Sequence, residues 1–182
     1  MSDLLASFTR ASGLVAAGLV VAALFSGLLF SSRATGERRR PAWWLDLHNG
    51  LGGLALVATV AHVVAALADH GAGIGVVDAL IPGTATTSRA ALSWGVVATY
   101  LLAGAVLTSW PRRLRNRSLW RTIHLGTVLA GGLALLHGYQ MGSDARGGAF
   151  QTGLVVAVAT GTYALALRVS DAVARQHARG RG

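Results

Sequence analysis

The sequence predicts an all-α fold, an integral membrane bundle of about five transmembrane helices that forms one domain over residues 1–182. Composition is the first observation: 53% of the residues are hydrophobic, 13% are charged and the mean hydropathy is +0.52, whereas soluble domains carry about 25% charged residues. The second is a series of five apolar stretches, each near the ~20 residues that let an α-helix cross ~30 Å of hydrocarbon. The third is that the sixteen basic residues, all arginine, fall mostly between these stretches.

The five apolar stretches give the predicted spans 13–30, 47–67, 91–109, 122–139 and 150–167. The segment before the first span carries Asp3 and only one arginine, so we expect a retained helix rather than a cleaved signal peptide. The apolar run 74–81 is too short to span and is closed by Pro82. It predicts an amphipathic or re-entrant segment at the outer surface.

The arginines set the expected orientation of the helices in the membrane. Thirteen fall on one side, whereas Arg10, Arg89 and Arg146 fall on the other. Because basic residues concentrate on the cytoplasmic side, this distribution predicts an outside N-terminus, a cytoplasmic C-terminus and a basic cytoplasmic tail over 169–182. It reads as membrane topology and not as nucleic-acid binding, and we expect the lipid bilayer as a partner. Four tryptophans at the ends of spans on the same side are typical of an interfacial belt: Trp43, Trp44, Trp110 and Trp120.

The chain has no cysteine, so disulfides, iron–sulfur clusters and thiolate zinc sites are excluded, and any metal must be held by histidine or oxygen ligands. Four of the six histidines lie inside spans, His48 and His62 on 47–67 and His124 and His137 on 122–139. Ionisable residues in a bilayer are costly and point to function. A single histidine inside a span is about as often a hydrogen-bonding contact to a neighbouring helix as it is a functional residue. Two pairs of histidines at matching depth favour a functional site.

Spans 47–67 and 122–139 are separated by one helix and therefore run parallel, so the depths of their histidines can be compared. His48 and His124 each lie four residues after a tryptophan, while His62 and His137 lie ~21 and ~20 Å further along their helices. We therefore expect the pairs His48/His124 and His62/His137. Each pair can supply two axial nitrogens to a haem iron, which predicts two haems between these helices. Zinc or copper would need three or four ligands at one depth.

The spacing of the two histidines within the span 122–139 does not suit a straight helix. Thirteen residues at ~100° each leave His137 ~140° away from the face of His124. Either the helix is distorted, with Gly131-Gly132 as the candidate place, or it meets the two haems from different sides.

At these histidines the chain resembles the ferric reductase-like transmembrane family, which includes the membrane parts of NADPH oxidases and ferric reductases and the haem subunit of a methionine sulfoxide reductase. Members have thirteen residues between the two histidines of one helix and twelve between those of the other. Here thirteen residues separate His48, in LHNGLG, from His62, in AH, and twelve separate His124, in WRTIH, from His137, in LHG. The resemblance covers about residues 43–145. It implies two b-type haems and transmembrane electron transfer. The unequal spacing differs from that of the cytochrome b of quinol-oxidising complexes.

Family enzymes that reduce iron or oxygen usually carry a flavin and nicotinamide domain. The glycines at 71–75 have no strand–turn–helix context, so we expect no nucleotide site there. The resemblance then implies that the chain is the electron-transfer component of an oxidoreductase, with no catalytic residue of its own. Its electron donor and acceptor would be separate redox proteins or quinol. The further cofactors would then be a quinone or a flavin bound to a partner protein. The lysine-free, arginine-rich composition suggests a bacterial inner membrane.

Several other residues have two possible roles. Arg121, one turn before His124, is a candidate partner of haem propionates with help from Arg117; contact with lipid headgroups is the alternative. His70 is expected to be a solvated helix-end residue or to line an acceptor site. For the ring N–H that does not face the iron we expect a backbone carbonyl or a Ser or Thr hydroxyl as acceptor, with Thr122 and Thr127 as candidates. For the chain as a whole, the alternative function is a small transporter, or a proton or metal relay that uses its intramembrane histidines.

Overall fold

The computed structural model describes residues 2–31, 42–109, 116–142 and 147–179, and every regular element among them is helical. The elements are α1 (Ser2–Ser31), α2 (Ala42–Ala68), the short 3₁₀ helix η1 (His70–Ala72), α3 (Val76–Leu80), α4 (Arg89–Ser109), α5 (Arg117–Met141) and α6 (Gly148–Arg179). Five of these helices are long and apolar enough to cross a membrane. The predicted all-α fold is therefore confirmed, and its five long apolar helices fit a multi-pass membrane protein.

The helices extend further than the apolar spans that predict them. α1 begins at Ser2 rather than near residue 13, and α6 continues to Arg179, so most of the predicted tail 169–182 is helical. Apolar content marks only the part of a helix that hydrocarbon covers, whereas backbone hydrogen bonding carries the helix on into the interface. The start of α5 has a local cause, because the Asn116 side chain accepts bonds from the amides of Ser118 and Leu119.

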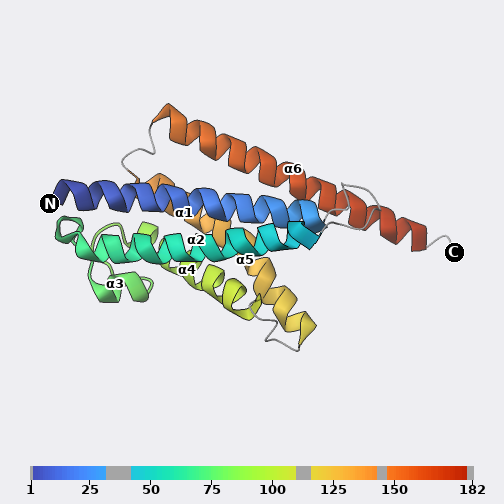
Figure 1. The fold of residues 1–182 in the computed structure, drawn as a ribbon, viewed down its shortest axis with the longest axis horizontal. Helices are drawn as coiled ribbons and strands as arrows, with labels where there is room; N and C mark the ends of the chain where they lie inside the picture. The colour runs from blue at the N-terminus through green and yellow to red at the C-terminus, as the bar shows by residue number, and fades with distance from the viewer. Residues whose placement is uncertain (1, 32–41, 110–115, 143–146, 180–182) are drawn as a thin grey trace.

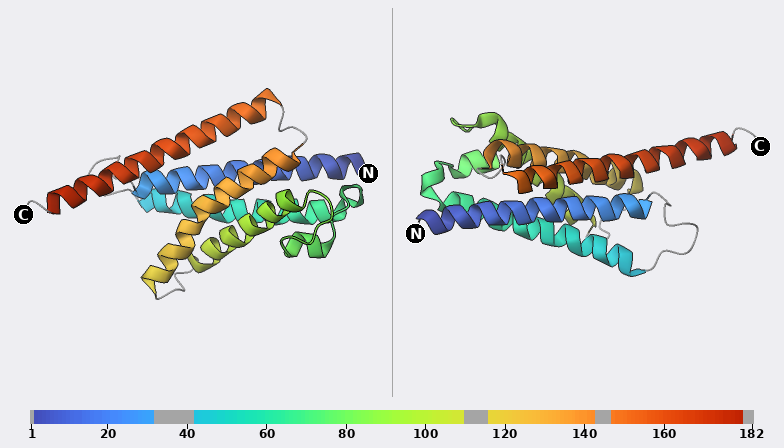
Figure 2. Two further views of the ribbon diagram at one scale, coloured as in Figure 1. Left: turned by 180° about the vertical axis from the view of Figure 1, so that it is seen from behind. Right: turned by 90° about the horizontal axis from the view of Figure 1, so that it is seen from above.

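Four of the long helices form two antiparallel hairpins (Figures 1 and 2). α1 packs closely on α2 and α4 on α5, and the hairpins meet where α1 contacts α5 and α2 contacts α4. The four contacts close a ring, which leaves α2 and α5 at opposite corners of the bundle. α6 packs on α1 outside this ring, and the two chain ends lie at opposite ends of the molecule (Figure 1).

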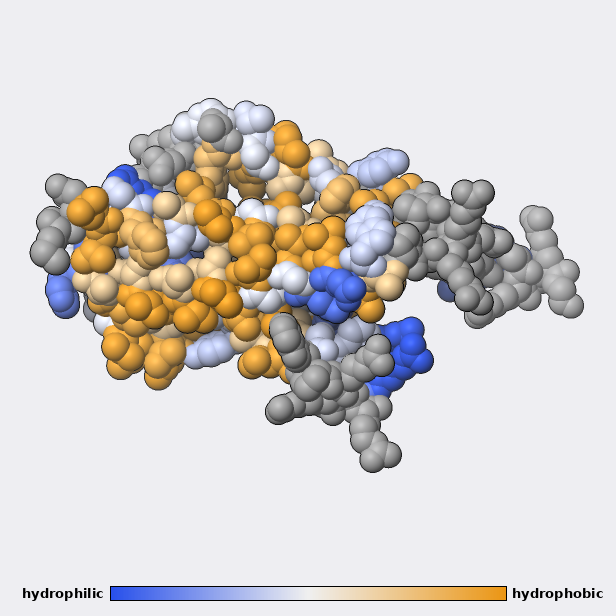
Figure 3. Space-filling model, in the orientation of Figure 1, coloured by the Kyte–Doolittle hydropathy of each residue, from blue (hydrophilic) through white to orange (hydrophobic). Residues whose placement is uncertain are grey.

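The centre of the bundle is a small apolar cluster of Val20, Ala55 and Leu102 from three different helices. Ala55 is fully buried, and it lies seven residues from each of the histidines of α2. The outer surface is also apolar (Figure 3), and on α2 its side chains are more than half exposed at Leu54, Val57, Val60 and Val64. A surface of this kind suits lipid rather than water.

The segment between α2 and α4 folds at one end of the bundle as η1 and α3. Asp69 caps η1 through the amide of Gly71, and the Tyr100 hydroxyl of α4 donates to the carbonyl of Leu80. With five residues, α3 does not span a membrane, as the run 74–81 predicts. Its valines and the following Ile81 are exposed, which fits a segment at the membrane surface.

Parts of the topology argument lie outside the described residues. These are the arginines Arg33, Arg38–Arg40, Arg112, Arg113, Arg115, Arg146 and Arg181, together with Trp110.

Candidate functional site

The four intramembrane histidines meet in two pairs across the bundle. His48 of α2 faces His124 of α5 with ring centroids 5.8 Å apart and planes at 69°. His62 faces His137 with centroids 6.2 Å apart and planes at 76°. These are the two pairs that the depth argument predicts. They bridge the two helices at opposite corners of the ring, so each pair spans the space between the hairpins.

Three of the four imidazole rings are anchored by the same kind of bond. In each, Nδ1 lies within hydrogen-bond distance of a main-chain carbonyl on the neighbouring helix of its own hairpin. A carbonyl oxygen only accepts, so Nδ1 must carry the proton and Nε2 keeps its lone pair. This tautomer presents Nε2 to a metal. The bonds join His48 to Ala23 (3.0 Å), His62 to Thr9 (2.9 Å) and His137 to Ala91 (2.8 Å).

A glycine lies one turn after each of these carbonyls and makes room for the ring. A Cβ at Gly27 would come within 2.8 Å of the His48 ring, and one at Gly95 within 2.8 Å of the His137 ring. A Cβ at Gly13 would come within 3.0 Å of His62. Such distances are too short for carbon atoms in contact. Each carbonyl with its glycine therefore forms one seat for a histidine, and we call these the three ring seats.

The separation of the rings suits one metal ion shared by each pair. Two imidazole nitrogens ~2.0 Å from a metal, each with its ring centre ~1 Å further away, place the ring centroids ~6 Å apart. The observed 5.8 and 6.2 Å lie at this value. Among the described residues no group of three or more His, Cys, Asp or Glu is gathered for a metal. The donor set is thus two imidazoles per site, which fits an ion whose other ligands come from a macrocycle.

His124 is the exception among the four. Its Nδ1 is buried and has no hydrogen-bond partner among the residues that the structure describes. The ring stacks instead on Trp120, with centroids 4.8 Å apart and planes at 19°. The indole N–H of Trp120 donates to the hydroxyl of Ser109 at the end of α4. This histidine is consequently held by a stacking contact and not by an anchored N–H.

A cavity of about 70 Å³ opens beside His48 and His124. Its wall is mainly apolar, with Asn49, Ser109 and Thr127 as the polar members besides the histidines. An apolar wall of this kind excludes water from the space between the rings and lowers the local dielectric.

α5 brings both of its histidines to α2 without a break in the helix. Figure 2 shows α5 bending along its length. Gly131, one of the two glycines that the sequence offers as the place of a distortion, lies against α1: a Cβ there would clash with Cδ1 of Leu24. At Gly132 nothing lies within 4 Å of such a Cβ.

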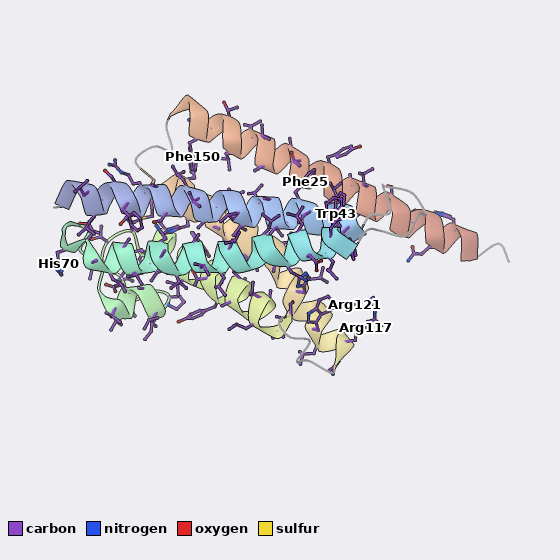
Figure 4. All side chains as sticks on the ribbon, viewed as in Figure 1. Phe25, Trp43, His70, Arg117, Arg121 and Phe150 are labelled. Carbon is purple, nitrogen blue, oxygen red and sulfur yellow. The ribbon has the colours of Figure 1, made fainter. Side chains whose placement is uncertain are left out.

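Other sequence candidates occupy the two ends of the bundle. Arg117 and Arg121 are exposed at the N-terminal end of α5, on the same side of the molecule as the His48/His124 pair, and His70 is exposed at the opposite end (Figure 4). The two threonines considered as helpers do not reach a ring. Thr122 donates to the carbonyl of Ser118, and Thr127 donates to the main-chain carbonyl of His124.

Sequence reasoning missed the contribution of α1 and α4, which supply all three ring seats. One signal is present in the sequence: Gly13 and Gly27 are fourteen residues apart, the same spacing as His48 and His62. On two antiparallel neighbouring helices, equal spacing places each glycine at the depth of one histidine, Gly13 at that of His62 and Gly27 at that of His48. Without knowing that α1 packs on α2, however, the glycines read only as small residues in a membrane helix.

Comparisons of the chain with protein-family models, with curated proteins and with solved structures found no match. The resemblance to the ferric reductase-like family therefore stays a prediction that depends on the four histidines and their spacing.

Proposed function

We propose that this protein carries electrons across a bilayer by means of two b-type haems, one between His48 and His124 and the other between His62 and His137. The observation that carries the proposal is the pair of facing imidazoles, with centroids 5.8 and 6.2 Å apart, found twice on helices at opposite corners of the bundle. Neither a core histidine nor a lone polar contact between helices requires this repetition.

The chain contributes oriented ligands, and the haem contributes the redox chemistry. A haem with two histidine ligands takes up and releases one electron and leaves no open iron position for a substrate. The carbonyls of Thr9, Ala23 and Ala91 fix the tautomer that leaves Nε2 available. These three carbonyls support a function as an electron carrier, since they hold the rings in place and are not themselves acids or bases.

The two sites also have a separation suited to the membrane. Fourteen residues of α2 correspond to a rise of ~21 Å, most of the ~30 Å thickness of the hydrocarbon. Between the sites, at the level of Ala55 midway between His48 and His62, lies the buried apolar cluster of Val20, Ala55 and Leu102. An apolar layer between two sites suits electron transfer better than the passage of protons or ions.

The proposal extends to the surroundings of the chain. The spacing of the histidines supports membership of the ferric reductase-like family, and the arginine distribution supports an outside N-terminus in a bacterial inner membrane. The chain would be the membrane subunit of an oxidoreductase. Quinol or a separate redox protein such as a flavoprotein would donate electrons, and an extracytoplasmic reductase, ferric iron or dioxygen would accept them. The exposed Arg121 is a candidate contact for the propionates of the nearer haem.

The direct test is a reduced-minus-oxidised spectrum and a pyridine haemochrome assay on the detergent-purified protein. We expect two b-type haems per chain. His48→Ala and His124→Ala should each remove the same haem, and His62→Ala and His137→Ala should each remove the other, because one lost ligand opens its site.

His70→Ala and His177→Ala are the matched controls, since both residues are exposed and belong to neither pair. Both variants should retain two haems. A colourless wild-type protein that stays colourless after reconstitution with haem would contradict the proposal and favour a transporter or a proton or metal relay. Loss of both haems in every histidine variant, with the fold intact, would contradict the assignment of separate pairs.

A further inference from the structure

The two hairpins of the bundle are built as a repeat of the same parts. In each hairpin the first helix (α1 or α4) carries the seats and the second (α2 or α5) carries the histidines. The two helices are antiparallel, so the N-terminal end of the first lies beside the C-terminal end of the second. On α1 the seat carbonyls are those of Thr9 and Ala23, fourteen residues apart. On α4 the carbonyl of Ala91 serves His137, and the residue fourteen positions later is Ala105. The repeat therefore predicts a fourth seat at Ala105.

The fourth seat lacks its glycine. In the other three seats the glycine follows the carbonyl by four residues, and the residue four positions after Ala105 is Ser109. Since a Cβ in the other seats would approach the ring to 2.8–3.0 Å, the Cβ of Ser109 occupies the space that a seated ring would need. Both Ala105 and Ser109 line the cavity beside His124, so the unused seat adjoins the ring that it would hold.

The state of His124 agrees with a closed seat. Its Nδ1 is the one ring nitrogen of the four intramembrane histidines that is buried without a partner in the described part of the chain. The Ser109 hydroxyl accepts from the indole N–H of Trp120 at 3.1 Å, and within the ranges that the structure describes it makes no hydrogen bond with Nδ1 of His124. The equivalent indole in the first hairpin, Trp44, donates instead to the carbonyl of Ser26 and leaves the His48 seat open.

We propose that Ser109 is a positioning residue that makes the two haem sites unequal: by closing the fourth seat it leaves His124 as the one axial ligand with no acceptor for its ring N–H. This inference depends on the proposed haem function. A ligand imidazole that donates its N–H is more basic and stabilises the ferric iron. His124 lacks that bond, so the His48/His124 haem has a higher reduction potential than it would have with four equal seats, and its iron exchanges this ligand more readily.

The test compares Ser109→Gly with Ser109→Ala by potentiometric titration of the two haems. Both variants remove the hydroxyl, but only the glycine removes the Cβ. Ser109 is the last residue of α4, where glycine is well tolerated. The potential of the His48/His124 haem is first identified with His62→Ala, which retains only that haem. Ser109→Gly should lower this potential, Ser109→Ala should leave it near the wild-type value, and the His62/His137 haem should not respond to either.

A second measurement uses the wild-type protein. Added cyanide should replace an axial ligand on one haem first, and that haem should be the one that survives in His62→Ala, with an affinity about 10- to 100-fold above that of its neighbour. Cyanide binding first to the His62/His137 haem would overturn the inference. So would a shift in potential that Ser109→Ala shares with Ser109→Gly, since the hydroxyl and not the Cβ would then be responsible. Failure of the haem proposal itself is distinct, because the wild-type protein would then contain no haem to titrate.

Discussion

At the scale of the residue, the distinctive feature of this protein is the way an imidazole is held inside a membrane. A buried ring N–H without an acceptor is costly, and in hydrocarbon water does not replace the missing bond. The helix carbonyls of Thr9, Ala23 and Ala91 answer this need by accepting the ring N–H in addition to their helical donor. Those of Thr9 and Ala23 also accept from the hydroxyls of Ser12 and Ser26. Glycine one turn later is what allows the ring to come close enough.

Gly27→Ala tests this requirement for glycine. Because the new Cβ would lie 2.8 Å from Cε1 of His48, the ring must leave its seat, and we expect loss of the His48/His124 haem together with a stability decrease of about 1–3 kcal/mol. Gly18→Ala on the same helix is the control, since nothing lies within 4 Å of that Cβ. The haem-to-protein ratio and the thermal midpoint report the result. Retention of both haems in Gly27→Ala would argue against the seat.

At the scale of the element, α5 must reach α2 with both histidines and still pack on α1. The contact with α1 depends on Gly131, whose missing side chain leaves space for Leu24. We expect Gly131→Ala to cost about 1 kcal/mol, at the lower end for overpacking because the end of a leucine side chain can rotate. In the double variant with Leu24→Ala this cost should disappear, which a double-mutant cycle of unfolding measurements detects. Gly132→Ala is the control, and equal costs with and without Leu24 would contradict the contact.

The elements and the partners of the histidines could be predicted from the sequence because they depend on local signals. Apolar length gave the five long helices, and the positions of Trp44 and Trp120 relative to His48 and His124 matched the depths of α2 and α5. Both signals follow from one-dimensional spacing along a helix.

A backbone carbonyl as acceptor of the ring N–H could be predicted, but which carbonyls serve the rings could not, because that depends on which helices are neighbours. Ala23 and Ala91 are ordinary alanines in the sequence, and only the packing of α1 on α2 and of α4 on α5 turns their carbonyls toward a ring. Thr127 was the reasonable candidate on composition, yet in a membrane helix its hydroxyl bonds the carbonyl of its own helix. The angular problem of His124 and His137 was likewise a three-dimensional question: α5 reaches both partners on α2 as one continuous, bent helix (Figure 2).

At the scale of the whole molecule, two hairpins of like construction meet so that each supplies one histidine to each pair. Neither hairpin holds a complete pair alone: α1 and α2 carry His48 and His62, and α4 and α5 carry His124 and His137. Assembly of the bundle and completion of both sites are therefore one event. Anything that bridges the pairs, as the proposed haems would, stabilises the association of the hairpins by the usual linkage of ligand binding to the folded state.

The same architecture makes the orientation in the membrane testable, since the hairpin ends alternate between the two faces. Thr86 is exposed between α3 and α4, and Ser118 is exposed in the first turn of α5. The start of α5 and the segment between α3 and α4 lie at opposite ends of the bundle (Figure 1). The chain has no cysteine, so Thr86→Cys and Ser118→Cys each introduce a single thiol. The excess of arginine on the side of Ser118 predicts that this side is cytoplasmic. In intact cells a membrane-impermeant maleimide should then label Thr86→Cys at once and Ser118→Cys only after the membrane is permeabilised. The reverse pattern would place the N-terminus inside and exchange the donor and acceptor sides of the two histidine pairs, while labelling of both thiols in intact cells would contradict a membrane-spanning bundle.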